Sequence, residues 1–276
     1  MSTHVTFSNG VSIPTIGVGF WEVPADRAQQ TVEEAVELGY RHLDGAAAYK
    51  NETEMGAGIR SCGVPREELF VTTKLQNGNQ GHDKALAAFD ASLERLGLDY
   101  VDLYLIHWPV AQWGLYNETW KALEEIYASG RAKAIGVANF LPEHIEDLLA
   151  HCEVRPMINQ FECHPSLQQR EIEEASKAAG MAIEAYSPIG RGVDLTNPVV
   201  EQVAAERECT PAQAILAWHL AKGRIVIPKS VHRERLAENL AAADVTLSEA
   251  NIAAIDSLEA GLRQTADPAT FDNTQF

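Results

Sequence analysis

The 276-residue chain lacks the features that would place it in a membrane or send it out of the cell. It contains no run of about 18 apolar residues, the length that a membrane-spanning helix needs. Its first residues, "MSTHVTFSNG", do not follow the basic, then apolar, then small-residue order of a secretory signal. We therefore expect a soluble, cytoplasmic protein whose length suits one large α/β domain or two small ones.

Cysteine and positive charge are both scarce. The cysteines at positions 62, 152, 163 and 209 form no CxxC pair, which favours free buried thiols over a disulfide framework. Only 22 Lys and Arg residues stand against 39 Asp and Glu, a formal net charge of -17. That balance argues against a nucleic-acid partner, because such binding depends on Lys and Arg that neutralise phosphates. An anionic ligand would need a local group of positive charges.

A complete dinucleotide-binding glycine motif is missing as well. The stretch "GVGFWEV" has the first two glycines of GxGxxG but not the third. A Rossmann turn is therefore not supported, and a dinucleotide would have to be bound in another way.

Short apolar or β-branched runs are present along the whole chain. The first two, "HVTF" and "VSIP", are joined by "SNG" and predict an N-terminal β-hairpin, because Asn-Gly favours a tight turn. Eight further candidate strands follow, in the order "TIGVGF", "RHLD", "LFVTTK", "VDLYLIH", "AIGVAN", "MINQFE", "AIEAYS" and "IVIPKS".

Helix-length segments separate these strands. Apolar residues recur at helical spacing at Leu86, Phe89, Leu93 and Leu96, and at Ala28, Val32, Ala35 and Val36. Alternating strands and helices indicate a parallel sheet, and eight such units favour a closed (β/α)8 TIM barrel over an open doubly wound sheet. No linker or low-complexity tract divides the chain, so we expect residues 1–276 to form a single domain.

Polar side chains stand at or near the ends of seven of the eight predicted strands. They are Asp44, Lys74, His107, Asn139, Gln160, Tyr186 and Lys229. Taken alone, Asp44 would most often be a turn or capping residue, Lys74 a solvent-facing charge and His107 a buried structural histidine. A closed barrel brings the carboxyl ends of its strands together around one cavity, and this joint pattern favours a functional site.

These residue types suit proton transfer to a carbonyl group. Tyrosine has an ordinary pKa near ~10, and a neighbouring ammonium such as Lys74 is expected to lower it. Asp44 would keep Lys74 charged and fix its direction, with Tyr49 at the end of the chain of contacts. His107 could orient a carbonyl oxygen beside the phenol. The set contains no reductant, so the reductant must be bound from outside.

The segment "IPKSVHRERLAENL" indicates where such a reductant would bind. It places Lys229 at a strand end and Ser230 at a helix N-cap, followed by Arg235, Glu238 and Asn239 on one helical face. A helix N-terminus flanked by Lys and Arg suits an anion. Arg suits a phosphate monoester such as the 2'-phosphate of NADP. Taken alone, the segment would more often be a surface helix with mixed charges.

Six motifs in order resemble the aldo-keto reductase family: "GYRHLDGAAAYKNETEMG", "TTKL", "LGLDYVDLYLIHWP", "IGVANF", "INQFECHP" and "IPKS....R..EN". The resemblance runs from the hairpin to about residue 260. The segment "WPVAQWGLYNET" is similar to the bacterial branch that includes diketogluconate and small-aldehyde reductases.

The resemblance implies NADPH-dependent reduction of small aldehydes, α-dicarbonyls or keto-sugars to alcohols. Tyr49 would be the general acid, Lys74 and Asp44 its tuning pair, and His107 the residue that orients the carbonyl. NADPH would be held by Asn139, Gln160, Tyr186, Ser187, Lys229, Ser230, Arg235, Glu238 and Asn239. The substrate would meet Trp21, Trp108, Trp113 and His107.

Four positions depart from the family pattern. Gly45 stands for the usual Thr or Cys, Lys50 for Gly, Gln76 for Trp, and Ala138 for the Ser of "GVSN". The missing hydroxyl at Ala138 removes one hydrogen bond to the nicotinamide carboxamide, a net term of roughly 0.5–1.5 kcal/mol. Lys50 and Gln76 predict a more polar pocket mouth.

Two alternatives come from other classes of protein. A metal-dependent hydrolase could combine His42, Asp44, His107, Glu162 and His164, although His42 and Asp44 belong to no HxH pair and His164 precedes a proline. A non-catalytic binding protein could also use such a barrel, but the intact set of proton-transfer residues speaks against it. With no long apolar surface stripe in the sequence, we expect a monomer.

Overall fold

The computed structural model describes residues 3–276. Its main sheet holds eight parallel strands in the order β10-β9-β8-β7-β6-β5-β4-β3. The strands are β3 (Val18–Gly19), β4 (His42–Asp44), β5 (Phe70–Leu75), β6 (Val101–Ile106), β7 (Ala132–Ala138), β8 (Ile158–Glu162), β9 (Ala182–Tyr186) and β10 (Ile225–Val226). Every strand predicted from the sequence is present.

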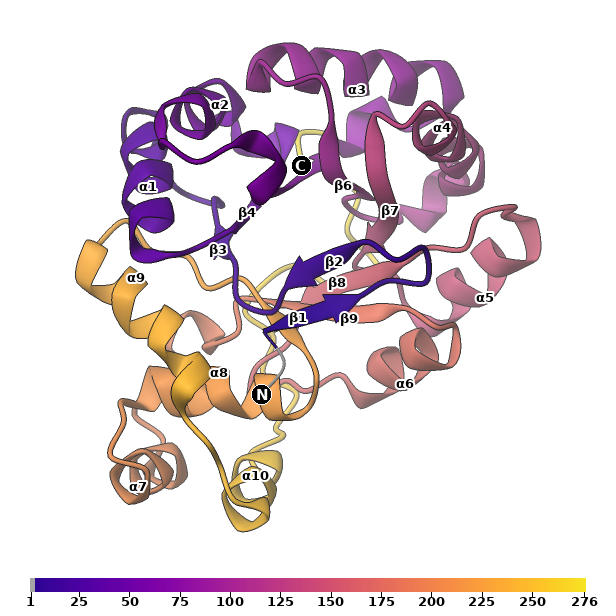
Figure 1. Ribbon diagram of the computed structural model, residues 1–276. Coiled ribbons are helices and arrows are strands. Elements are labelled where there is room, and N and C mark those ends of the chain that lie inside the picture. Colours follow the sequence, from indigo (N-terminus) through magenta and orange to yellow (C-terminus); the bar gives the residue numbers. More distant parts are fainter. Residues whose placement is uncertain (1–2) are drawn as a thin grey trace.

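The two edge strands of this sheet meet and close it. Ile16 forms a parallel bridge with Val226. The Gly17 amide donates to the Val226 carbonyl at 2.8 Å, and the Val226 amide donates to the Thr15 carbonyl at 2.9 Å. The eight strands therefore curl into a barrel (Figure 1), and the expected (β/α)8 fold is confirmed.

Helices surround the barrel. They are α1 (Ala25–Leu38), α2 (Glu52–Ser61), α3 (His82–Leu96), α4 (Tyr116–Ala128), α5 (Pro142–His151), α6 (Arg170–Ala178), α7 (Pro198–Glu206), α8 (Pro211–Ala221), α9 (Arg233–Leu240) and α10 (Glu249–Asp256). The predicted apolar stripe of α1 is buried, and so is that of α3 except for half-buried Leu86. These stripes pack against the outer faces of the strands and form the main core.

The N-terminal hairpin closes one end of the barrel. Its strands β1 (His4–Thr6) and β2 (Ser12–Pro14) pair antiparallel, and they lie across the barrel opening in Figure 1. Phe7 and Ile13 are buried there against apolar side chains that include Phe70, Leu103 and Ile158. Because this end is filled with apolar groups, a polar pocket has to lie at the other end.

The C-terminal segment returns to that other end. The Asn77 amide donates to the Phe276 carbonyl at 2.6 Å, and the Gly78 amide donates to the Thr274 carbonyl at 3.0 Å. Gln112 Nε2 donates to the Phe271 carbonyl at 3.2 Å. Residues 271–276 are thus fixed to the loops that follow β5 and β6.

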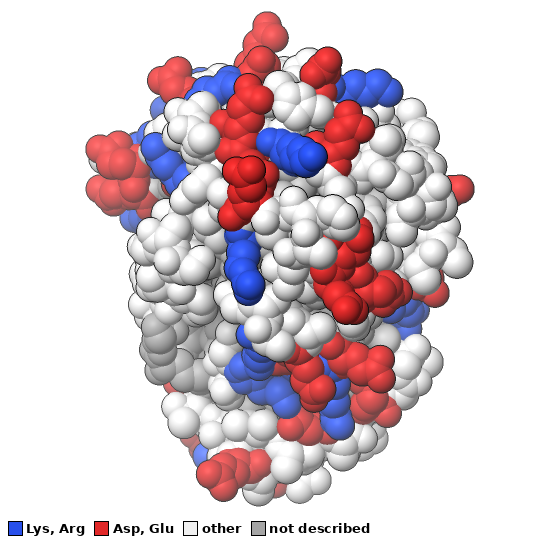
Figure 2. All heavy atoms as spheres, turned by 90° about the vertical axis from the view of Figure 1, so that its right-hand side faces the viewer, with Lys and Arg blue, Asp and Glu red and all other residues white. Residues whose placement is uncertain are grey.

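The surface carries charges of both signs. On the face that includes α5, Lys and Arg side chains lie intermixed with Asp and Glu (Figure 2). Within residues 3–276, no helix is both long and apolar enough to cross a membrane. The single domain over residues 1–276 stays a prediction.

Candidate active site

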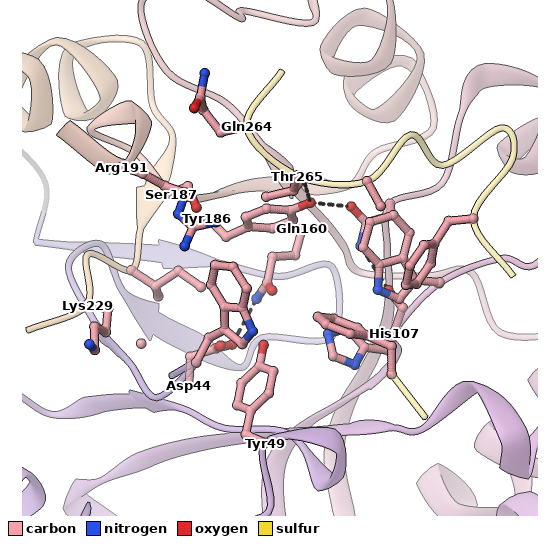
Figure 3. Close-up of a pocket in the computed structure, with 18 residues that line it drawn as sticks. Asp44, Tyr49, His107, Gln160, Tyr186, Ser187, Arg191, Lys229, Gln264 and Thr265 are labelled. Carbon is pink, nitrogen blue, oxygen red and sulfur yellow. Dashed lines mark hydrogen bonds between the residues drawn. The ribbon is translucent and has the colours of Figure 1, made fainter. Parts of the chain in front are cut away.

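A cavity of about 310 Å³ opens at the carboxyl ends of the strands (Figure 3). Its lining mixes aromatic rings with polar side chains. It is formed by Gly19, Trp21, Asp44, Tyr49, His107, Trp108, Asn139, Gln160, Tyr186, Ser187, Arg191, Ile227, Lys229, Gln264, Thr265, Ala266, Phe271 and Phe276. Most of the residues predicted from strand ends therefore meet in one place.

The Tyr49 hydroxyl points into the centre of this cavity (Figure 3). Tyr49 ends a short 3-10 helix, η1 (Ala47–Tyr49), which follows β4 and lies against β5. Lys74 Nζ lies 3.5 Å from the hydroxyl, within reach of a hydrogen bond. The structure thus brings this phenol and this ammonium together, as the sequence predicts.

Lys74 is fully buried and bound mainly by two oxygens. Its Nζ donates to Asp44 Oδ1 at 2.5 Å and to the Gly45 carbonyl at 2.9 Å. Asp44 is itself only 1% exposed. Because an unpaired charge in this interior would be costly, each partner depends on the other.

The phenol of Tyr49 does not become more acidic, contrary to the sequence prediction. Burial, with the charges of Asp44 and Glu184 adding, raises the pKa of Tyr49 well above its ordinary value of 10.0. The lysine lies closer to Asp44 than to the phenol, so much of its charge is offset by that carboxylate. Tyr49 therefore keeps its proton at neutral pH, as a proton donor must.

His107 stands beside Tyr49 as a neutral imidazole. Its ring lies 5.6 Å from the Tyr49 ring, edge to face. Burial, with the charge of Lys74 adding, lowers the pKa of His107 well below its ordinary value of 6.5. A neutral imidazole in this position can donate one hydrogen bond to a carbonyl oxygen without bringing a second positive charge.

A second carboxyl group, absent from the sequence predictions, lies beneath these residues. Glu184 of β9 and Gln160 of β8 are register neighbours, so their side chains lie side by side in the barrel. Gln160 Nε2 donates to Glu184 Oε2 at 2.6 Å and to Asp44 Oδ2 at 2.8 Å. Burial, then the charge of Asp44, raises the pKa of Glu184 to about 8. We call Asp44, Lys74 and Glu184 the floor cluster.

His42 completes this polar interior. Its Nε2 lies 3.4 Å from Glu184 Oε1, and burial lowers its pKa to about 4. The imidazole packs directly on the backbone of Gly17, where an added Cβ would lie 2.4 Å from Nδ1. His42 and Glu184 therefore form a neutral pair at neutral pH.

His42, Asp44 and Glu184 are the one group of three or more His, Cys, Asp or Glu residues within residues 3–276 whose ligand atoms lie close enough together to share an ion. This set differs from the one considered for a hydrolase, because Glu162 and His164 bind elsewhere, to each other and to Asp194. Lys74 already supplies a cation 2.5 Å from Asp44. A metal ion there would be repelled by that ammonium.

Asn139 and Tyr186 form another part of the wall. Asn139 Nδ2 donates to the His107 carbonyl at 2.9 Å, and its Oδ1 accepts from the Tyr186 hydroxyl at 2.9 Å. Asn139 has a left-handed backbone, with φ of 63°, which Asn tolerates better than most residues. Both N–H groups of Gln160 are engaged by carboxyl groups, which leaves its Oε1 to face ligands in the cavity.

Ser187 and Lys229 lie at the opposite end of the cavity from His107 (Figure 3). The other predicted cofactor residues, Ser230, Arg235, Glu238 and Asn239, follow on or just before α9 and do not line this cavity. The expectation that Ser230 caps the helix is wrong: α9 begins at Arg233 with His232 as its N-cap residue. Ser230 Oγ instead accepts from the His232 amide at 3.1 Å.

The rest of this group differs in exposure. Arg235 is exposed and Asn239 is buried. Glu238 accepts from Thr210 Oγ1 at 2.5 Å, which fixes α9 to the start of α8.

Aromatic side chains form the end of the cavity where the sequence predicts the substrate. Trp21 and Trp108 line the cavity, and Phe271 and Phe276 join them from the C-terminal segment. The Phe276 ring lies 4.9 Å from the His107 ring. Trp113, predicted as a third tryptophan wall, lies on the short 3-10 helix after β6 and is not part of the lining.

The positions that depart from the family pattern have local explanations. Lys50 and Gln76 do not make the mouth polar as predicted, because both line a separate hollow with Glu52, Asn79 and Arg95. Gly45 leaves room for Met55, whose Sδ would lie 2.8 Å from an added Cβ. Ala138 is buried in the apolar interior of the barrel.

Several lining residues had no counterpart in the sequence predictions. Glu184 interrupts an apolar strand, "AIEAYS", and a buried acid in such a run could have been recognised. Gln264 and Thr265 lie on a loop and Arg191 in a single 3-10 turn of the segment after β9, and no periodicity reveals the conformation of such connections.

Comparison with known proteins identifies relatives over the whole chain. Residues 14–260 match the model of the aldo/keto reductase family. An aldo-keto reductase of Mycolicibacterium smegmatis is 48% identical over 99% of this chain and 100% of its own length. Glyoxal reductase of Bacillus subtilis is 45% identical over 96% of this chain and 95% of its own. The crystal structure of a Gox0644 mutant in complex with NADPH superimposes with a TM-score of 0.94, at 42% identity, over 99% of this chain and 100% of that one.

Proposed function

The chain belongs to the aldo/keto reductase family, and from that premise we propose that it reduces small aldehydes and α-dicarbonyls to alcohols, with Tyr49 as the proton donor. The family makes it an NADP-dependent oxidoreductase that acts on small carbonyl compounds. The observation that supports the finer proposal is the meeting of Tyr49, Lys74 and His107 in one cavity.

Tyr49 would give its proton to the carbonyl oxygen as that oxygen gains negative charge. The raised pKa keeps the proton on the phenol until a substrate needs it. Once the proton has left, the phenolate lies 3.5 Å from Lys74 Nζ, which stabilises the new charge. Asp44 holds that ammonium in place.

His107 would hold the carbonyl oxygen next to this phenol. As a neutral imidazole it can donate a hydrogen bond that polarises the C=O bond. Trp21, Trp108 and Phe276 surround the remaining space with apolar surface. A cavity of about 310 Å³ suits a small carbonyl compound, as the glyoxal reductase relative also suggests.

The residues at the other side fit a nicotinamide. Gln160 Oε1 is left free of the two carboxyl groups that take its N–H groups, so it can accept from a carboxamide. Asn139 is fixed by His107 and Tyr186 on the same wall. When bound, NADPH supplies the hydride for the carbonyl carbon. Tyr186 and Ser187 would lie against the ring.

Lys229, Ser230, Arg235, Glu238 and Asn239 would hold the adenosine end. We expect Arg235→Ala to weaken NADPH binding by about tenfold or more, because an Arg–phosphate contact is charge-assisted, while NADH binding stays nearly unchanged. Fluorescence titration with both cofactors measures this difference. An equal loss for both would show that Arg235 does not contact the 2'-phosphate.

Tyr49→Phe is the decisive test of the proton donor. Loss of a general acid typically lowers turnover by about 10²–10⁴-fold, so we expect kcat with glyoxal-type dicarbonyls to fall by that factor. NADPH oxidation followed by absorbance gives the rate, and fluorescence titration shows whether the cofactor still binds. Unchanged turnover with intact cofactor binding would remove Tyr49 from this role.

A further inference from the structure

A buried histidine outside the proposed catalytic set lies between two carboxylates. His164, on the loop after β8, has no exposed surface. Its Nε2 lies 3.2 Å from Glu162 Oε1, and its Nδ1 lies 2.8 Å from Asp194 Oδ2. We call these three residues the wall cluster.

Within this cluster, Glu162 is the residue that binds the C-terminal segment. Its Oε1 accepts from the Gln264 amide at 2.7 Å, and its Oε2 accepts from Thr265 Oγ1 at 2.5 Å and from the Thr265 amide at 3.1 Å. Gln264 and Thr265 line the cavity above Tyr186 (Figure 3). Thr265 Oγ1 also lies 3.0 Å from the Tyr186 hydroxyl, so this segment touches the residue proposed to lie against the nicotinamide.

Asp194 holds a second segment, the loop of residues 187–194. Ser187 and Arg191 of this loop line the cavity. Gly190 shows how closely the loop fits: at a φ of 58°, an added Cβ would lie 2.6 Å from Asp194 Oδ2 and 3.0 Å from His164 Nδ1. The fold of this loop is therefore built around the Asp194–His164 contact.

We propose that His164 is a positioning residue that ties the C-terminal segment of residues 263–265 to the loop of residues 187–194, so that two walls of the pocket are held as one unit. The consequence for the cofactor rests on the proposed function. The tie itself is a property of the chain alone, because both contacts are made by protein groups.

The chemistry of the imidazole suits this role. Both ring nitrogens face carboxylates, so both must donate, which requires the protonated form. Burial opposes that charge, but the hydrogen bonds and charges of Asp194 and Glu162 outweigh it and raise the pKa of His164. Ser166 Oγ lies 3.1 Å from Nδ1, and Arg263 Nη1 lies 3.7 Å from Glu162 Oε2. Burial, with the charges of Arg224 and His164 among the further causes, lowers the pKa of the neighbouring His219 well below its ordinary value of 6.5.

Two substitutions can separate the two contacts. The amide nitrogen of His164→Asn takes the approximate position of Nδ1, which keeps the Asp194 contact and loses the Glu162 contact. The amide nitrogen of His164→Gln takes the approximate position of Nε2, which keeps the Glu162 contact and loses the other. Each variant keeps one hydrogen bond, so each is expected to fold.

Amide hydrogen exchange of the protein without cofactor is the direct test. We expect His164→Asn to speed exchange at the Gln264 and Thr265 amides by about tenfold or more. Both amides donate to Glu162, and Glu162 loses its charge-assisted hydrogen bond from His164 in this variant. For His164→Gln, the same acceleration is expected at the amides of Gly190, Gly192 and Val193, which donate to carbonyls within the loop. His144→Gln is the matched control, a buried histidine on α5 that contacts neither segment.

A second readout uses NADPH. Both His164 variants should release NADPH faster than the native protein in stopped-flow fluorescence. His144→Gln should release it at the native rate. Unchanged exchange in both segments, or equal acceleration over the whole chain, would overturn the tie. If the native protein does not bind NADPH, the proposed function fails while the exchange result still stands.

Discussion

The floor cluster and the wall cluster are each built from one cation and two carboxyl groups, yet their charges differ. In the wall cluster both carboxylates lie within 3.2 Å of the imidazole of His164. The hydrogen bonds of Glu162 and Asp194 outweigh burial and lower the pKa of each carboxyl group. All three groups are therefore charged at neutral pH.

In the floor cluster only one carboxyl group reaches the cation. Asp44 lies 2.5 Å from Lys74, whereas Glu184 bonds to the amide of Gln160 and its pKa rises to about 8. Both carboxyl groups are equally buried in the barrel. The comparison teaches that a hydrogen bond to a cation, more than depth of burial, decides which buried acid is ionised.

Removing the cation of the floor cluster should have the largest effect. Lys74→Met leaves the buried Asp44 with its hydrogen bond from Gln160 but without a positive partner, which is expected to cost about 3–5 kcal/mol of unfolding free energy and to abolish turnover. Urea unfolding and the NADPH oxidation assay measure the two effects.

The double variant Lys74→Met with Asp44→Asn separates stability from catalysis. It removes both charges, so its stability should return to within about 1–2 kcal/mol of the native protein. Turnover should stay lost, because nothing stabilises the Tyr49 phenolate. A stable Lys74→Met single variant would show that Asp44 carries no charge without its lysine.

Matched amide substitutions sharpen the comparison between the second carboxyl groups. At pH 7, Asp194→Asn loses a charge-assisted hydrogen bond to His164 and should cost about 1.5–3 kcal/mol. Glu184→Gln replaces a buried protonated acid, which would give up its proton on unfolding at this pH, by a neutral amide, so no loss of stability is expected. Chemical unfolding of both variants in the same buffer compares them directly.

The pH dependence of stability tests whether Glu184 is protonated in the folded protein. The folded pKa of Glu184 lies above its ordinary value of 4.5, so the folded state holds a proton that the unfolded state loses. The native protein therefore loses stability from this group as pH rises from 4.5 to about 8. Glu184→Gln should gain stability relative to the native protein over that window. A relative loss instead would mean that Glu184 is ionised in the folded state.

The sequence predicted the floor cluster better than the wall cluster for a physical reason. Asp44 and Lys74 belong to strands, whose period and parallel order bring their carboxyl ends together. The wall cluster joins Glu162, the last residue of β8, to His164 and Asp194 on two loops, and Asp194 has no pattern around it that indicates a partner 30 positions away. Pairing of strands could be predicted, but the paths of loops could not.

The error over Tyr49 has a related cause. The sequence showed that a lysine would be near the phenol, but the sign of the pKa shift depends on distances. Lys74 Nζ lies 1.0 Å closer to Asp44 Oδ1, at 2.5 Å, than to the Tyr49 hydroxyl, at 3.5 Å. Whether the pKa of Tyr49 rises or falls could therefore be decided only from the three-dimensional structure.

Substitution of Lys50 is expected to have the smallest effect on stability and turnover, because this residue is a cation outside both clusters. It is exposed and has a left-handed backbone with φ of 57° and ψ of 31° at the end of η1, where glycine carries no steric penalty. Lys50→Gly should therefore stabilise the protein by about 0.5–1 kcal/mol, measured by urea unfolding. Lys50→Ala is the control that removes the same charge and keeps the backbone strain, so its stability should stay within about 0.5 kcal/mol of native. Because water and salt screen an exposed charge, neither variant should change the pH profile of kcat. A shifted pH profile of kcat in Lys50→Ala would show that the charge of Lys50 acts on Tyr49 in spite of its exposure, as the charges of the floor cluster do.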